Sequence, residues 1–158
     1  MMLRKALLTI LDNLSVQEVH AHCDGPCGVY DPASARVAAE AVLSMTKKLI
    51  ALTPPQDGDS DAVLAYQNTF SRFVAIKEDQ AKETKKELLI LWTDYFKPEH
   101  LAKFPDLHET FWKATKLCSA TKVNIDQEKA EELLKSVEKI HHMFWDSKGR
   151  SDSWITAS

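Results

Sequence analysis

Apolar side chains recur at helical spacing along most of the chain, and no segment alternates with the period of a β-strand. The first stripe advances in steps of three and four residues: Ala35, Ala38, Val42, Met45, Leu49 and Leu52. Such steps place side chains on one face of an α-helix. Asp31 and Pro32 suit the start of this helix, as an N-cap followed by proline at the first helical position. A loop rich in proline, glycine and aspartate is predicted over 53–60.

A second, longer helix is predicted from about Asp61 to Phe96, where Lys97 and Pro98 end it. Its expected inner face is largely aromatic and apolar: Tyr66, Phe70, Phe73, Leu88, Leu91 and Tyr95. The middle of this helix, 77–87, is nearly all polar. We expect that part to be solvated on most sides or to face a partner subunit.

Two further helices complete the pattern. Pro105 suits the start of the third, which has the stripe Leu107, Phe111, Ala114 and Cys118, and Cys118 is expected to be a small core residue. Asp126 caps the fourth, which Gly149 ends and whose inner face is Ala130, Leu133, Val137, Ile140 and Phe144. The polar tail after Gly149 is expected to fray. Four amphipathic helices with short connections predict an all-α fold, an antiparallel four-helix bundle over 31–148.

The first 21 residues have a different character. Leu3, Leu7, Ile10 and Leu14 fall at helical spacing, behind the basic residues Arg4 and Lys5. The uninterrupted apolar stretch is shorter than the ~7–15 residues of a secretory signal. We therefore interpret 1–21 as a leader or prosegment, cleaved from a functional domain over 22–158.

Composition excludes several classes of function. The 158 residues carry a net charge of −3, which argues against a nucleic-acid binder. No apolar run reaches the ~18 residues of a membrane span, so we expect no membrane association and a cytoplasmic location. The chain has only 4 Gly and 3 Cys, yet two of each crowd into a hook, HCDGPCG at 22–28. That crowding is the one departure from an ordinary globular composition.

The hook has the donors and the turn of a metal site. Cys23 and Cys27 can bind one metal if the chain between them turns tightly, and Gly25-Pro26 supplies that turn. Thiolates with nitrogen donors suit a soft or borderline metal, and a square-planar set suits Ni(II) or Cu(II). A zinc site would need a second ligand pair. The dense cluster His141-His142 is a poor candidate, since adjacent helical residues point about 100° apart.

Cleavage after Ala21 would make His22 the amino terminus of the mature chain. Its α-amine, the backbone amide and thiolate of Cys23 and the thiolate of Cys27 would then form a planar N₂S₂ set, with the His22 imidazole available as an axial ligand. Anionic amide and thiolate donors can bring a Ni(III)/Ni(II) couple into the biological range. The alternatives are a disulfide between Cys23 and Cys27 on an inert helical module, and a metal-binding or metal-delivery protein without catalysis.

Two blocks of sequence resemble the nickel superoxide dismutases. HCDGPCGVYDPA at 22–33 resembles the mature N-terminal hook of that family, and LWTDYFKP at 91–98 followed by KFPDLH at 103–108 resembles a second family block. The resemblance extends from about residue 22 to 145. It implies disproportionation of superoxide to dioxygen and hydrogen peroxide, one nickel per subunit cycling between +2 and +3, and a homohexamer of four-helix bundles. It also implies a protease that removes the leader.

The resemblance assigns roles residue by residue. His22, Cys23 and Cys27 match the nickel ligands, and Tyr30 and Tyr95 match tyrosines that line the approach to nickel. Around them, Asp24 matches a residue that holds the shape of the hook, together with Gly25 and Pro26 at its turn, and Lys97 matches a cation near the mouth. His20 lies in the leader and is expected to be only a neighbour of the cleavage site. The histidines at 100, 108, 141 and 142 are expected to be structural or surface residues.

Two positions depart from the family pattern. Some members hold the axial imidazole with a glutamate on the first helix and an arginine on the second, and these positions are Ala38 and Gln80 here. Both partners are missing together, which avoids leaving one charge unpaired. Partners of this kind normally orient a metal ligand. The residue that orients His22 therefore stays open at the level of sequence.

Overall fold

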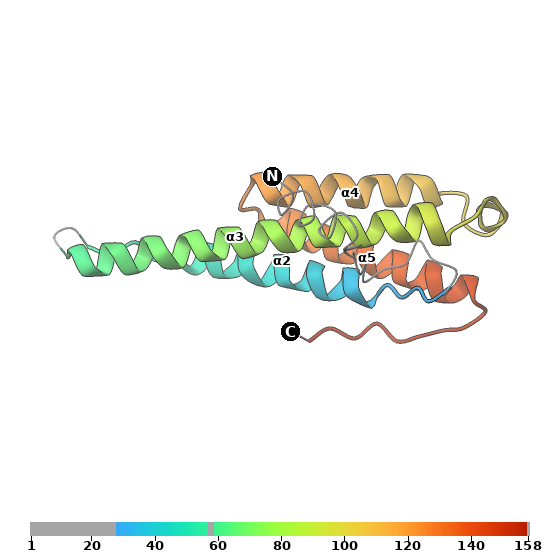
Figure 1. Cartoon of the computed structure of the whole chain (residues 1–158), viewed down its shortest axis with the longest axis horizontal. Helices are drawn as coiled ribbons and strands as arrows, with labels where there is room; N and C mark the ends of the chain where they lie inside the picture. Colours follow the sequence, from blue (N-terminus) through green and yellow to red (C-terminus); the bar gives the residue numbers. More distant parts are fainter. Residues whose placement is uncertain (1–27, 57–58, 158) are drawn as a thin grey trace, which may run out of the picture.

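The computed structural model describes residues 28–56 and 59–157, which form an antiparallel four-helix bundle (Figure 1). The four helices are α2 (Ala33–Ala51), α3 (Ser60–Ile90), α4 (Leu107–Val123) and α5 (Gln127–Ser147). The main interhelical contacts join α2 to α3 and α5, and α4 to α3 and α5. The described segments contain no strand. The predicted all-α fold is therefore confirmed.

Aspartate side chains begin three of the four helices, as the sequence predicts for Asp31 and Asp126. Asp59 accepts hydrogen bonds from the backbone N–H groups of the first turn of α3, and Asp126 accepts one from Lys129 N–H. At α2, Asp31 Oδ1 accepts from Ala33 N–H at 2.8 Å, and α2 starts one residue after Pro32. These bonds satisfy N–H groups that have no partner within the helix.

The core lies along the facing stripes of all four helices. Fully buried side chains include Val42, Leu88, Phe111, Leu133, Ile140 and Phe144. Cys118 is also fully buried, as predicted, and its desolvation raises the pKa of the thiol to about 12. This thiol is therefore neutral at physiological pH and acts as a small apolar side chain.

The polar middle of α3 is exposed or half-buried over most of its surface, in agreement with the sequence-based expectation, but one face of it is buried. Lys77, Ala81, Thr84 and Glu87 form a buried stripe on it. Lys77 Nζ donates to the carbonyl oxygens of Thr121, Lys122 (2.9 Å) and Asn124 (3.0 Å), at the carboxyl end of α4. Those carbonyls lack helical partners, so an ammonium group can be buried against them. Burial lowers the pKa of Lys77, and the charge of Glu78 opposes that shift.

Three half-buried aromatic residues of the predicted inner face lie in the first half of α3. Tyr66 and Phe70 stack on each other at 6.1 Å between ring centroids, and Phe73 follows one turn later. Figure 1 gives the reason, because the first turns of α3 extend beyond α4 and α5. The bundle is therefore thinner at this end and leaves these side chains half-buried.

The carboxyl end of α3 differs in detail from the continuous helix predicted to Phe96. The α-helix stops at Ile90, a single π-helical turn covers Leu91–Tyr95, and a 3₁₀ turn covers Pro98–Ala102. In the π turn, Phe96 N–H donates to Leu91 O at 3.0 Å, five residues back. The next helix starts at Leu107 rather than at Pro105. Turns of the π type inside helices are frequent at functional sites, because the extra residue redirects the side chains.

The tail after α5 folds back onto the bundle instead of fraying. Gly149 has a positive φ of 67°, and the chain then runs back along α2 (Figure 1). Ala157 N–H donates to Glu40 Oε1 at 2.7 Å, and Glu40 also pairs with Arg36 at 2.8 Å. A buried carboxylate with two donors fixes the tail at a point that composition alone does not predict.

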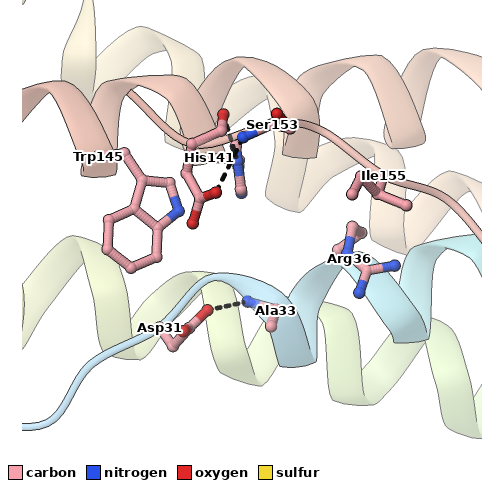
Figure 2. Close-up of a pocket in the computed structure, with 8 residues that line it drawn as sticks. Asp31, Ala33, Arg36, His141, Trp145, Ser153 and Ile155 are labelled. Atoms are coloured by element: carbon pink, nitrogen blue, oxygen red, sulfur yellow. Dashed lines mark hydrogen bonds between the residues drawn. The ribbon is translucent and has the colours of Figure 1, made fainter. Parts of the chain in front are cut away.

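A cavity of about 210 Å³ lies where the tail crosses the start of α2 and the end of α5 (Figure 2). Asp31, Arg36, His141 and Trp145 line it, together with tail residues that include Ile155. His141 Nε2 lies 3.4 Å from the carbonyl oxygen of Asp152 in the tail. His141 is thus a structural residue, as the sequence predicted.

Within the part of the chain that the structure describes, no helix combines the length and the apolar character needed to cross a membrane.

Candidate functional site

The predicted hook, with His22, Cys23 and Cys27 and the turn around Asp24-Gly25-Pro26, lies outside the described residues. The description begins at Gly28, the residue after Cys27, which has a positive φ of 65°. Glycine adopts this conformation without steric cost. Residues 28–56 and 59–157 contain no group of three His, Cys, Asp or Glu residues that could hold a metal ion.

A cavity of about 380 Å³ lies at the point where the hook joins the bundle. Its walls come from the segment before α2 and from the segment after α3, which meet at one end of the bundle (Figure 1). The lining residues are Gly28, Tyr30, Asp94, Tyr95, Lys97, Glu99 and His100. Three predicted site residues, Tyr30, Tyr95 and Lys97, are therefore brought together there. We call this cavity the mouth.

The two tyrosines of the mouth contact each other across the bundle. The ring centroids of Tyr30 and Tyr95 are 5.5 Å apart at an angle of 54°. Tyr30 belongs to the extended segment before α2, whereas Tyr95 ends the π turn. Both are half-buried, and both line the mouth.

Aromatic neighbours hold the ring of Tyr95 on several sides. Its centroid lies 4.5 Å from that of Phe144 and 5.0 Å from that of Phe96. His100 stacks on it at 5.8 Å with an interplanar angle of 14°. Lys148 Nζ lies 5.1 Å from the ring centroid, within the range of a cation–π contact. The ring therefore has little freedom to rotate away from the mouth.

His100 also shapes the loop that carries Lys97. The ring nitrogen Nδ1 of His100 accepts a hydrogen bond from the backbone N–H of Lys97 at 2.9 Å, and the backbone N–H of His100 donates to Lys97 O at 2.9 Å. Because Nδ1 accepts, a neutral His100 carries its proton on Nε2. The exposed Lys97 side chain is thus mounted on a loop closed by two hydrogen bonds.

The sequence did not single out several residues of the mouth. Asp94 and Glu99 line it, and Ser147 and Lys148 contact Tyr95 from the end of α5. The only signal for Ser147 was its position three residues after Phe144, in the last turn of the predicted helix. The contact itself depends on how the ends of α3 and α5 align, which a periodicity of apolar residues does not specify.

Comparison with known proteins decides the family. The family model described as nickel-containing superoxide dismutase matches residues 17–148. The chain belongs to the nickel-containing superoxide dismutase family. A curated relative, the nickel superoxide dismutase of Streptomyces seoulensis, is 40% identical over 131 residues, which is 83% of this chain and 91% of the relative. The enzyme of Streptomyces coelicolor is 38% identical over 130 residues, 82% of this chain and 90% of that protein.

Solved structures of nickel superoxide dismutases share the fold. A crystal structure with nickel ligation of the oxidised state is 39% identical, with a TM-score of 0.68, and covers 81% of this chain and 99% of its own. An apo structure is 33% identical, with a TM-score of 0.64 and coverages of 77% and 98%. The family match ends at residue 148, so the tail that runs back along α2 lies beyond it.

Proposed function

We propose that this chain disproportionates superoxide: two superoxide ions and two protons give one dioxygen and one hydrogen peroxide. Membership of the nickel superoxide dismutase family is the observation that carries this proposal. The mouth supports it, because its lining begins at Gly28, one residue after Cys27, and includes Tyr30, Tyr95 and Lys97. The metal-delivery alternative gains no support from a specific feature of the described residues.

The cofactor is nickel, one per subunit. When bound in the hook, it would accept the electron that superoxide gives up in one half-reaction and would supply the electron that superoxide gains in the other, alternating between +3 and +2. The donor set of the hook suits it: the α-amine of His22, the amide nitrogen and thiolate of Cys23, the thiolate of Cys27 and the imidazole of His22. Thiolates select soft metals, and a planar nitrogen–sulfur set suits Ni(II). Asp24, Gly25 and Pro26 would hold the turn between the two thiolates.

The residues of the mouth would control access to the hook. Tyr30 and Tyr95 form one wall of the approach, since their rings contact each other with centroids 5.5 Å apart and both line the mouth. Lys97 would attract the anion, because it contributes an ammonium group to the lining.

The position of the hook implies a precursor. The α-amine ligand exists only after a protease cuts between Ala21 and His22, so residues 1–21 would act as a prosegment that blocks metal binding until it is removed. The functional domain is then 22–158, with the hook at 22–30, the bundle at 31–148 and the tail at 149–158. We further propose a cytoplasmic homohexamer, as the resemblance implies.

The orientation of the axial imidazole departs from the pattern seen in some family members. Ala38 is buried in α2 and its side chain offers no polar group. Gln80 is half-buried on α3, where its backbone carbonyl oxygen accepts a hydrogen bond from the Thr84 hydroxyl. A neutral pair therefore replaces a charged one. We expect a metal site that still forms but whose axial ligand is held by other groups, with a correspondingly altered redox potential.

Nickel content tests the ligand assignment. A chain that starts at His22, refolded with Ni(II), is expected to bind one nickel by elemental analysis and to show the absorption of thiolate-to-nickel charge transfer. Cys23→Ser and Cys27→Ser remove a thiolate each and should abolish both signals. Cys118→Ser is the matched control, because that thiol is buried among the helices. Full nickel binding by the Cys27→Ser chain would contradict the assignment.

A further inference from the structure

The phenol of Tyr95 ends against the last turn of α5. Its oxygen lies 2.6 Å from Ser147 Oγ, and Ser147 Oγ lies 2.6 Å from the carbonyl oxygen of Phe144. Three oxygen atoms thus form a chain from the mouth into the helix end. None of them is a proposed nickel ligand, and sequence reasoning had assigned no role to Ser147.

The direction of both hydrogen bonds follows from a count of protons. A carbonyl oxygen carries no proton, so the contact between Ser147 and Phe144 requires the serine hydroxyl to donate. Because serine has a single O–H, its oxygen can then only accept from Tyr95. The phenol O–H of Tyr95 therefore donates its hydrogen bond to Ser147 Oγ.

The carbonyl at the end of this chain is available for a structural reason. In a continuing α-helix, Phe144 O would accept from Lys148 N–H. Here α5 ends at Ser147, and Lys148 N–H instead donates to Trp145 O at 3.1 Å. Carbonyls in the last turn of a helix need other donors, and a hydroxyl three residues on can supply one. The helix end thereby fixes the rotamer of Ser147, and Ser147 fixes the direction in which the phenol hydroxyl of Tyr95 donates.

We propose that Ser147 is a positioning residue that makes Tyr95 a hydrogen-bond acceptor at the mouth. With its proton held by Ser147, the phenol oxygen offers only lone pairs to whatever enters the cavity. It can accept from water or from protonated product, but it does not donate its proton to superoxide. The proposal rests on the proposed function for the role of the mouth, whereas the chain of hydrogen bonds does not depend on nickel.

The hydrogen bond from Tyr95 to Ser147 is tested on the metal-free full-length chain, labelled with ¹³C at tyrosine Cζ. The chemical shift of this carbon reports the hydrogen bonding of the phenol. The chain has 3 tyrosines, and Tyr→Phe variants assign their resonances. Ser147→Ala is expected to shift the Tyr95 resonance. Tyr66 serves as an internal control, because it stacks on Phe70 near the start of α3. Ser147→Thr, which keeps a hydroxyl, should return the Tyr95 resonance to its wild-type position.

The function is tested on the chain that starts at His22, loaded with nickel. Ser147→Ala should slow superoxide consumption several-fold at unchanged nickel content, and Ser147→Thr should restore it. A Tyr95 resonance that does not move in Ser147→Ala would overturn the proposal. So would Ser147→Thr shifting that resonance as far as Ser147→Ala does. A wild-type chain inactive toward superoxide, with the expected resonance shifts intact, would instead refute the proposed function.

Discussion

Individual charges at the mouth must attract superoxide, because the whole chain repels it. The net charge is −3, and the substrate is an anion. Among the residues lining the mouth, Lys97 provides the ammonium group, while Asp94 and Glu99 provide carboxylates. Charges at such short range act on a small ion more strongly than distant ones, which salt screens. Lys97 therefore offsets one of these two carboxylates and is the cation of the mouth lining on which local attraction depends.

Charge reversal at Lys97 should slow the encounter with substrate. For Lys97→Glu we expect the bimolecular rate constant for superoxide to fall by about two- to tenfold at low ionic strength, because three carboxylates would then line the mouth. The rate should also respond differently to added salt, since the attraction that salt screens is gone. Stopped-flow decay of superoxide over a range of salt concentrations measures both effects.

Two controls separate this effect from damage to the metal site. Lys47→Glu makes the same charge change on an exposed position of α2 away from the mouth lining and should leave the rate nearly unaltered. Nickel content should stay at the wild-type value in both variants. If Lys97→Glu matches the wild-type rate at every salt concentration, local steering is wrong.

At the scale of elements, Lys77 ties α3 to the end of α4. Lys77 is 1% exposed, and its ammonium group donates to three carbonyls of the Thr121–Asn124 segment. Removing the ammonium group would leave the buried bond to Thr121 O and two partly buried bonds without a donor of equal strength. Hydrogen bonds to a charged group contribute about 1.5–3 kcal/mol each in net stability, with strong non-additivity among neighbours.

We expect Lys77→Met to lower the free energy of unfolding by about 2–3 kcal/mol, since methionine fills most of the volume but donates no hydrogen bond. Urea unfolding followed by circular dichroism at 222 nm measures this change. Lys82→Met makes the same substitution at an exposed position of α3 and should change stability by less than about 0.5 kcal/mol. Equal stability of the two variants would show that the α4 end needs no ammonium group.

The helices were predictable from sequence, and their ends were only partly so. Apolar spacing placed the stripes of all four helices, and aspartates at 31 and 126 marked two starts, whereas the cap at Asp59 was not predicted. The burial of Lys77 was not predicted, because a pattern of apolar and polar residues counts lysine as polar and does not show that three carbonyl oxygens at the end of α4 accept hydrogen bonds from it. The π turn at Leu91–Tyr95 has no periodic signal either, since it adds one residue within a helix that otherwise keeps its spacing.

At the scale of the whole molecule, one end of the bundle gathers the parts of the site. The segment before α2, the turns after α3 and the end of α5 meet there (Figure 1). The crowded composition of the hook predicted the ligand chemistry, and the resemblance added Tyr30, Tyr95 and Lys97. Ser147 could not be foreseen, because it reaches Tyr95 only through the packing of distant segments, and His100 stacks on Tyr95 only because a 3₁₀ turn follows the π turn. The path of the tail along α2 was not predicted either, because it also depends on contacts between distant segments.

The central claim is that superoxide is consumed at a nickel site built on a free amino-terminal histidine. The most direct measurement compares two nickel-treated chains, one starting at His22 and one retaining Ala21, by stopped-flow decay of superoxide. We predict catalytic decay with the first chain and only spontaneous dismutation with the second, because a peptide bond removes the α-amine donor. Equal catalytic rates from both chains would contradict the account.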